Sequence, residues 1–306
     1  MGRSRRGGRD VHGVVLLDKP RELGSNQVLQ MVKRLFGARK AGHTGSLDRL
    51  ASGLLPICLG EATKLSGFLL NADKRYRAGI RLGVRTATGD AEGAVVDRRP
   101  VPLLSDRTVE AALERFRGPI QQIPPMHSAL KHQGQRLYKL AHQGITVERE
   151  PREVVIRRLV CRHWDQERID LDIDCSKGTY VRTLSEDIGE ALGTTAHVDE
   201  LRRVGSGPFG EEEMVPLETL QEAAKSGSLD RFLTPMEAVL SDWPAVSLSR
   251  DTAWYLRRGQ PVRVPRAPTA GWVRLRAEDE RFMGVGEVLD DGRIAPRRLI
   301  GGDGGR

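Results

Sequence analysis

One loop of this chain has the composition of a catalytic segment. Asp48 lies within residues 41–53, five positions after His43, and glycines flank it at positions 45 and 53. Glycine permits positive φ and close approach to the main chain, and the apolar run 54–59 that follows is expected in the core. A polar loop joined to a buried segment presents a reactive carboxylate rigidly, although a solvated tight turn would leave the same pattern.

Charge and composition favour a nucleic-acid partner. The 306-residue chain carries 49 Lys and Arg against 41 Asp and Glu, a formal net charge of +8. A basic protein attracts phosphate backbones, while an aromatic content of 5% argues against wide base-stacking surfaces. The basic residues gather in five clusters: Arg3, Arg5, Arg6 and Arg9; Lys33, Arg34, Arg39 and Lys40; Arg152, Arg157 and Arg158; Arg202 and Arg203; Arg297 and Arg298.

The sequence disfavours several other classes of protein. Cys58, Cys161 and Cys175 are widely spaced, which predicts neither a disulfide framework nor a metal site and indicates a reducing, cytoplasmic location. Apolar runs fall short of the roughly 20 residues of a membrane span. The Arg- and Gly-rich residues 1–10 lack the apolar core of a secretory signal. We therefore expect a protein without metal and without membrane association.

The hydrophobic pattern predicts an α+β fold with a mixed or antiparallel sheet and flanking helices. Strands are expected at 11–17, 76–83 and 169–175, the last because apolar residues alternate with Asp. Ser25 and Thr179 are expected to cap two helices, and Arg182 in the first turn of the second would favour an anion there. Residues 121–152 are rich in Pro, Gly, His and Lys, which predicts a long insertion that folds onto a partner.

Several segments, in order and spacing, resemble the TruB family of tRNA pseudouridine synthases. The loop around Asp48 is one of them, and the match runs from about residue 10 to residue 300. The matching segments are GVVLLDKP at 13–20, AGHTGSLDRLASG at 41–53, KRY at 74–76, RLG at 81–83, IPP at 123–125, SALK at 128–131, SKGTYVRT at 176–183, LRR at 201–203 and APRRL at 295–299.

The resemblance implies an organisation and an activity. A pseudouridine synthase domain would span 10–246 with an RNA-binding insertion at about 121–152, and a small β-rich, PUA-like RNA-binding domain would span 247–301. A basic disordered N-terminus at 1–9 and a Gly-rich tail at 302–306 complete the chain. The implied enzyme is a cofactor-free monomer, without an obligatory protein partner, that acts on the T arm of tRNA. It would convert the uridine at tRNA position 55 to pseudouridine by base flipping and glycosidic bond cleavage.

The resemblance also implies roles for individual residues. Asp48 would be the catalytic carboxylate, Arg182 the partner that keeps it ionised, and Tyr76 the aromatic ring that stacks on the flipped uracil. His43 would fill the space that the flipped nucleotides leave. Substrate binding is further expected from Lys19, Asp90, Tyr180 and Leu201, and RNA binding from Lys131, Arg152, Arg202, Arg203, Arg297 and Arg298.

Alternatives stay open for several of these residues and for the whole chain. Lys19 would equally suit a structural place beneath the site, Arg182 a phosphate contact, and Arg297 a solvated edge. Arg49 stands where the family usually has Pro, which would loosen the loop and place a second cation beside Asp48. The scaffold could also serve as a non-catalytic tRNA-binding or tRNA-folding module, or as a guide-dependent relative like dyskerin. The long insertion and the short C-terminal domain favour the stand-alone type.

Overall fold

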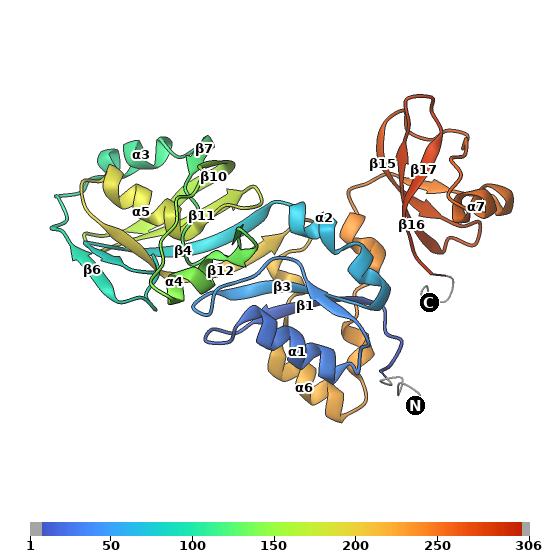
Figure 1. Ribbon diagram of the computed structural model, residues 1–306, viewed down its shortest axis with the longest axis horizontal. Helices are drawn as coiled ribbons and strands as arrows, with labels where there is room; N and C mark the ends of the chain where they lie inside the picture. Colours follow the sequence, from blue (N-terminus) through green and yellow to red (C-terminus); the bar gives the residue numbers. More distant parts are fainter. Residues whose placement is uncertain (1–7, 302–306) are drawn as a thin grey trace.

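The computed structural model describes residues 8–301, and a long mixed sheet forms the body of the protein (Figure 1). Nine strands take part in the order β13-β1-β3-β12-β4-β11-β10-β7, with β2 paired to β3. The pairs β1–β13 and β3–β12 are parallel and the other neighbours antiparallel. The strands are β1 (Gly13–Lys19), β2 (Ala41–His43), β3 (Ser52–Leu59), β4 (Lys74–Leu82), β7 (Gly118–Gln122), β10 (Arg152–Trp164), β11 (Arg168–Cys175), β12 (Ala196–Ser206) and β13 (Val215–Pro216). The predicted α+β class is confirmed.

A short parallel contact between β3 and β12 divides this sheet into two halves. One half contains β13, β1, β2 and β3, and the other contains β12, β4, β11, β10 and β7. Pairing there is limited to Arg202 with Ser52 and Arg203 with Gly53. The main chains approach so closely that a Cβ on Gly53 would lie 2.2 Å from the Arg203 carbonyl oxygen. Gly53 also has φ +97, which side-chain-bearing residues rarely adopt. Glycine at this position is therefore required both by space and by backbone conformation.

Helices cover each half of the sheet separately (Figure 1). Helices α1 and α6 contact each other and lie against the β1–β3 half, and α3 and α5 pack on the half that contains β4, β10 and β12. A capping box between Ser105 and Thr108 begins α3. The helices are α1 (Ser25–Leu35), α2 (Ser66–Asn71), α3 (Asp106–Glu114), α5 (Val181–Ala191) and α6 (Leu217–Lys225), with short 3-10 turns η1 (Gly60–Lys64), η2 (Glu211–Glu213), η3 (Leu229–Phe232) and η4 (Met236–Leu240).

Two predicted helix caps are wrong. Helix α1 begins at Ser25 after Gly24, and the Ser25 hydroxyl bonds the main chain of Leu47 instead of its own helix. Helix α5 begins after Tyr180, and the Thr179 hydroxyl donates to the Ser176 carbonyl oxygen. The Ser25 hydroxyl thus bonds a loop that is distant in the sequence, and the Thr179 hydroxyl bonds the turn that precedes its helix. A local sequence pattern does not reveal either partner.

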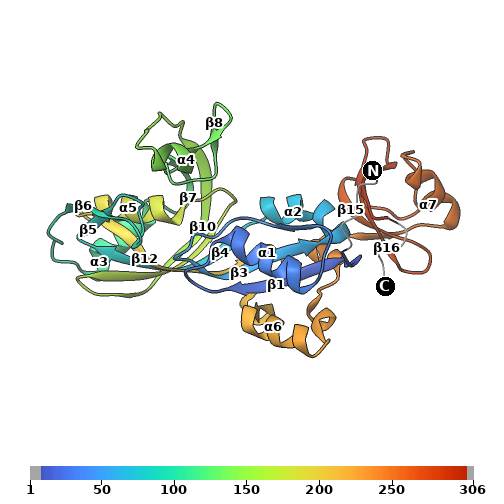
Figure 2. The same cartoon turned by 60° about the horizontal axis from the view of Figure 1, so that its bottom comes forward.

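The insertion forms an arm that rises from the sheet (Figure 2). It carries a hairpin of β8 (Lys131–His132) and β9 (Gln135–Arg136), followed by α4 (Leu137–His142). Within α4, Leu137 and Leu140 are buried. A further hairpin of β5 (Val84–Thr86) and β6 (Val95–Arg98) lies at the far end of the body. That the arm folds onto a partner stays a prediction.

A separate four-stranded sheet lies at the other end of the molecule (Figures 1 and 2). Its order is β14-β15-β16-β17, formed by β14 (Ala245–Ser247), β15 (Gly271–Arg276), β16 (Phe282–Val288) and β17 (Ile294–Leu299), with α7 (Arg250–Arg257) beside it. Phe68 of α2 packs edge-on against Trp243 and Trp272. The centroid of its ring lies 5.0 Å from that of Trp243 and 5.6 Å from that of Trp272. Lys64 Nζ donates to the Leu299 carbonyl oxygen at 3.0 Å. The small domain is therefore attached to the segment that follows β3, while its predicted boundaries stay predictions.

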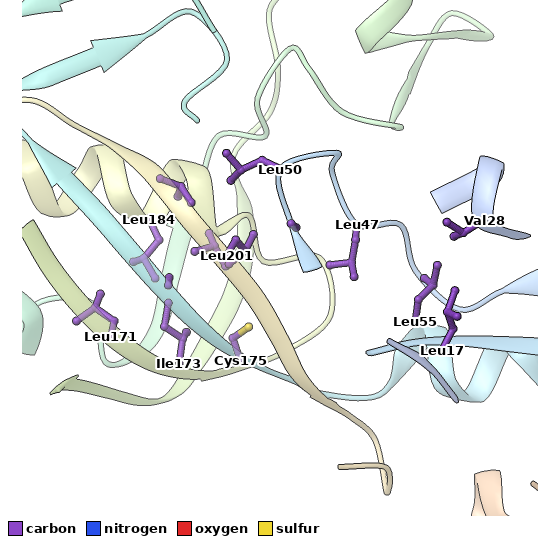
Figure 3. Packing of buried hydrophobic residues seen from close by; sticks show 14 of the residues in the cluster. Leu17, Val28, Leu47, Leu50, Leu55, Leu171, Ile173, Cys175, Leu184 and Leu201 are labelled. Carbon is purple, nitrogen blue, oxygen red and sulfur yellow. The ribbon is translucent and has the colours of Figure 1, made fainter. Parts of the chain in front are cut away.

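The main apolar core reaches into the loop around Asp48 (Figure 3). Leu47 and Leu50 belong to the same buried cluster as Leu184 and Leu201, so apolar contacts hold the loop on either side of the carboxylate. Between residues 8 and 301, no helix has the length and hydrophobicity that crossing a bilayer requires. The cluster Arg3, Arg5 and Arg6 and the predicted tail at 302–306 lie outside the described residues.

Replacing Gly53 tests the junction of the two half-sheets. We expect Gly53→Ala to lower the free energy of unfolding by about 2–4 kcal/mol, because the new Cβ would collide with the Arg203 main chain. Gly227→Ala is the matched control, since Gly227 has φ +72 but open space around it, and should cost only about 1 kcal/mol. Urea unfolding measures both, and equal losses would contradict the close approach.

Candidate active site

Asp48 and Arg182 form an ion pair at the base of a cleft. Arg182 Nε lies 3.0 Å from Asp48 Oδ2, and the arginine is buried while 46% of the Asp48 side chain stays accessible. Arg182 also donates from Nη1 to the Thr88 carbonyl oxygen at 2.9 Å and from Nη2 to the His127 carbonyl oxygen at 2.7 Å. With both outer nitrogens held by main-chain acceptors, the guanidinium presents Nε to the carboxylate in a fixed direction.

Asp90 lies beside Arg182 and borders a hollow next to Asp48. Its Oδ2 is 3.6 Å from Arg182 Nη1, and its Oδ1 accepts from the Thr88 hydroxyl at 2.6 Å and from the Glu92 amide at 3.1 Å. The side chain is almost fully buried, so its hydrogen bonds are used within the protein. This carboxylate therefore positions Arg182, and substrate binding by Asp90 stays a prediction.

The main chain of the Asp48 loop is held by distant side chains. Ser25 Oγ donates to the Leu47 carbonyl oxygen at 2.8 Å and accepts from the Leu47 amide at 2.7 Å. Arg203 donates from Nη2 to the Gly45 carbonyl oxygen at 3.1 Å and from Nε to the Leu54 carbonyl oxygen at 2.6 Å. The loop is thus fixed on both sides of the carboxylate by groups from α1 and β12.

These contacts disfavour RNA binding by Arg203 and Arg202, which stays a prediction for both. Arg203 is only 1% exposed, and its guanidinium is hydrogen-bonded to main-chain carbonyls at the edge of the cleft. Arg202 points to the opposite side of β12 and forms two 2.9 Å hydrogen bonds with the Asp18 carboxylate of β1. The two arginines therefore tie β12 to the β1–β3 half of the sheet. Adjacent positive charges resemble a basic surface in sequence, but a strand directs neighbours to opposite faces.

Lys19 is also structural, as the alternative interpretation of it allowed. It is 0% exposed, and its ammonium donates to the Pro20 and Leu23 carbonyl oxygens at 2.8 and 2.7 Å. Burial lowers the pKa of Lys19 to about 8, and the Asp48 charge opposes that shift. Lys19 lies beneath the site and adds positive potential there. This burial disfavours substrate binding by Lys19, which stays a prediction.

Arg49 does not draw Asp48 away from Arg182. Its side chain is 68% exposed, and its Nε donates to the Glu22 carbonyl oxygen at 3.1 Å. In return the Glu22 amide donates to the Arg49 carbonyl oxygen at 2.7 Å, with Glu22 at φ +69. These two hydrogen bonds, together with a 4.0 Å approach of Arg49 to Glu92, connect the Asp48 loop to Glu22 and Glu92. They restrain the loop at the position where a proline would have restricted its backbone.

The cleft above Asp48 collects most of the remaining predicted side chains. Its volume is about 670 Å³, and His43, Tyr76, Tyr180 and Leu201 line it together with the ion pair. Tyr76 lies on β4, where it pairs with Ile173 and Arg203 of the neighbouring strands. The structure therefore brings these four side chains to Asp48, as their predicted roles require.

His43 and Tyr76 have ionisation states shaped by the cleft. Burial, with the Arg203 charge, lowers the pKa of His43, so the neutral imidazole is favoured. Its Nδ1 is buried without a hydrogen-bond partner among the described residues. Burial likewise raises the pKa of the Tyr76 hydroxyl. Both rings are therefore uncharged surfaces at neutral pH, suitable for contact with a base.

The Asp48 carboxyl experiences opposing influences. Protein atoms around the cleft desolvate the carboxyl and so raise its pKa. The positive charge of Arg182 lowers this pKa, and the negative charge of Asp90 raises it. Although water still reaches 46% of the side chain, desolvation is the largest of these effects, so the pKa lies above that of a free Asp. The sequence predicted the ionising effect of Arg182 but not the opposing effect of the cleft.

The four other predicted RNA-binding residues occupy three separate surfaces. Lys131 is exposed on the arm, and Arg152 is exposed at the start of β10, near enough to Tyr180 to influence its pKa. Arg297 and Arg298 are exposed on β17 of the small domain, with Arg297 Nε bonded to Glu287 at 2.7 Å. A second hollow beside Asp48, of about 900 Å³, is bordered by Arg136, Tyr138, Lys139 and His142 of the arm. A role in RNA binding stays a prediction for these residues.

Sequence reasoning missed Ser25, Thr88 and His127 as parts of the site. Ser25 was interpreted as a helix cap, and the other two contribute main-chain carbonyls, which any residue type can supply. Over residues 8–301, the His, Cys, Asp and Glu side chains form no group of three that could hold a metal ion.

Three family models match nearly the whole chain. Residues 33–181 match the model described as "TruB family pseudouridylate synthase (N terminal domain)". Residues 182–241 match "tRNA pseudouridylate synthase B C-terminal domain", and residues 244–300 match "Pseudouridine synthase II TruB, C-terminal".

Individual relatives agree with these models. A tRNA pseudouridine synthase B of Coxiella burnetii is 57% identical over 295 residues, which cover 95% of this chain and 96% of that protein. The protein of the same name from Serratia proteamaculans is 51% identical over 310 residues, 98% of either chain. A chain in the crystal structure of a Cbf5-Nop10-Gar1 complex shares the fold, with a TM-score of 0.73 and 24% identity over 94% of this chain and 84% of that one.

The titration of Asp48 provides a direct test of the site's electrostatics. Removing the cation in Arg182→Gln should raise the pKa of Asp48 further, because the remaining desolvation and the Asp90 charge both favour the protonated form. Arg99→Gln, at an exposed ion pair with Glu190, should leave that pKa unchanged. Carboxyl-carbon NMR of the labelled Asp residues measures both, and a lower Asp48 pKa in Arg182→Gln would contradict the assignment.

Proposed function

This chain belongs to the TruB family of pseudouridylate synthases, and we propose that it isomerises the uridine at position 55, in the T arm of tRNA, to pseudouridine. The tRNA substrate follows from the names of its relatives. The observation that supports catalysis most directly is the 3.0 Å ion pair between Arg182 and Asp48 at the base of an open cleft.

The reaction rearranges one nucleoside without adding or removing atoms. The bond from C1′ to N1 breaks, the uracil turns, C5 bonds to C1′, and the C5 proton leaves as N1 gains one. Because the target base is stacked in folded tRNA, it must be flipped into the cleft at a cost of about a few kcal/mol. The cleft volume of about 670 Å³ accommodates a nucleotide.

Asp48 supplies the carboxylate for this rearrangement. Attack on the base, attack on C1′ and removal of a sugar proton remain open as its role, and each requires the ionised form. Arg182 favours that form and fixes its direction, while Tyr76 offers a ring face to the flipped uracil. Since the pKa of Asp48 is raised, activity should decline with acidification at a higher pH than for a free Asp.

Substituting Asp48 tests the catalytic role. We expect Asp48→Asn to reduce pseudouridine formation at least about a thousandfold while tRNA affinity changes only a few-fold, because the amide preserves shape but cannot act as nucleophile or base. Tritium release from tRNA labelled at C5 of uridine measures the rate. Asp97→Asn, at a surface ion pair with Arg99, should retain wild-type activity. Substantial product from Asp48→Asn would exclude the assigned role.

A non-catalytic tRNA-binding or tRNA-folding module is the alternative on the same scaffold. Multiple turnovers by the wild-type chain would exclude it. Activity on a bare T-arm stem-loop without guide RNA would likewise exclude a guide-dependent mode of action.

Arg152 offers a test of phosphate contact beside the cleft. It is exposed and has no ion-pair partner within residues 8–301, so a bound phosphate would be its natural counter-charge. Arg152→Ala should weaken tRNA binding several-fold and reduce the slope of log affinity against log salt by about one. Arg99→Ala, where Glu190 already pairs the charge, should leave the slope unchanged. An unchanged slope in Arg152→Ala would place this residue outside the interface.

A further inference from the structure

Gln122 links the end of β7 to the start of α5, although its partner there is 58 residues away in the chain. Its amide oxygen accepts from the Tyr180 amide at 3.0 Å, and its amide nitrogen donates to the Tyr180 carbonyl oxygen at 3.3 Å. The side chain is only 2% exposed. Both polar ends of this buried amide therefore have a partner on one and the same residue.

Tyr180 is the residue at which α5 begins, and its own side chain makes no capping hydrogen bond. Its carbonyl oxygen accepts the first helical bond, from the Leu184 amide at 3.0 Å. In a capping box, the amide of the N-cap residue is bound by a side chain of the same helix. Here a side chain of β7 binds that amide instead, so the sheet fixes the point at which the helix starts.

Arg182 lies in the first turn of α5, just beyond the residue that Gln122 holds. The path of the main chain there sets the direction in which the arginine leaves the helix. Its guanidinium is then held by the carbonyl oxygens of Thr88 and His127, and its Nε lies 3.0 Å from Asp48 Oδ2. His127 belongs to the segment that follows Gln122. The end of β7 and the start of the arm therefore restrain Arg182 both at its main chain and at its guanidinium.

We propose that Gln122 is a positioning residue for the reaction, which acts by fixing the start of α5 and so the distance between Arg182 and Asp48. Gln122 borders neither of the two hollows beside Asp48, so it acts without touching a ligand there. Misplacement of a catalytic group by about 1 Å can cost roughly a hundredfold in rate. The inference rests on the proposed function, because the ion pair is the feature on which that function depends.

The chemistry of the amide suits this place because one end accepts a hydrogen bond and the other donates one. Methionine has a similar length and volume but would leave the amide and carbonyl of Tyr180 without these partners. Glutamate keeps an acceptor for the Tyr180 amide and loses the donor. Arg152 is the cross-strand neighbour of Gln122 in β10 and would supply a counter-charge for that carboxylate. The two substitutions thus remove two bonds or one at nearly constant size.

Single-turnover pseudouridine formation at saturating tRNA measures positioning separately from binding. We expect Gln122→Met to lower this rate about tenfold with tRNA affinity within about twofold of wild type, and Gln122→Glu to lower the rate about threefold. Gln121→Met is the matched control, because Gln121 precedes Gln122 in β7 but is exposed, and it should keep the wild-type rate. A wild-type rate in either Gln122 variant, or an equal loss in Gln121→Met, would overturn the proposal.

The titration of Asp48 distinguishes the positioning of Arg182 from a general loss of stability. The Arg182 charge lowers the pKa of Asp48, so a displaced guanidinium should leave that pKa higher in Gln122→Met than in wild type. The acid limb of the rate profile should then move to higher pH. Ser105→Ala, which removes the capping hydroxyl of α3, should lower stability and leave the Asp48 pKa unchanged. A reduced rate with an unchanged Asp48 pKa in Gln122→Met would contradict action through Arg182.

These two measurements separate the inference from the proposed function. A wild-type chain that makes no pseudouridine would refute the proposed function, while carboxyl-carbon NMR of Asp48 in Gln122→Met would still test how Arg182 is held. Wild-type catalysis whose rate and Asp48 pKa do not respond to Gln122→Met would refute the inference alone.

Discussion

The contact between β3 and β12 is the constraint on which the rest of the structure depends. Only two residue pairs join the half-sheets in parallel there. Two neighbouring arginines add side-chain hydrogen bonds across this short contact. Arg202 reaches across one face to Asp18, and Arg203 reaches across the other to the carbonyls of Gly45 and Leu54. A strand that directs adjacent side chains to opposite faces can therefore secure a junction from above and below.

The candidate site lies at this junction because its two main charges come from different halves. Asp48 belongs to the loop before β3, and Arg182 belongs to α5, which packs on β12 and β4. The 3.0 Å separation between them is therefore set by how the half-sheets meet. Ser25, Arg203 and Asp90 hold the two partners, so the accessible surface of Asp48 is left for a ligand.

The hydrophobic pattern predicted the fold class, and glycine spacing with the apolar run after it indicated the loop that carries Asp48. The family was implied by the resemblance of several segments in order and spacing. Prediction from the sequence failed where a residue's partner lies far along the chain. Arg203 has the charge of an RNA-binding residue, yet it is buried and its guanidinium donates to the carbonyl oxygens of Leu54 and Gly45, 149 and 158 residues away. Ser25 resembled a helix cap, but its hydroxyl serves Leu47, 22 residues away. Only the folded arrangement determines which polar group satisfies which acceptor.

The anchors of the Asp48 loop have a consequence for the order in which the protein folds. The bond from Arg203 to Gly45 spans 158 residues, and that from Arg203 to Leu54 spans 149. Contacts of such length form late, since closing a long loop costs entropy before it returns any stabilisation. A ribosome-bound chain that has not yet released β12 would hold its Asp48 loop without these supports. Completion of the Asp48 site therefore coincides with completion of the nine-stranded sheet.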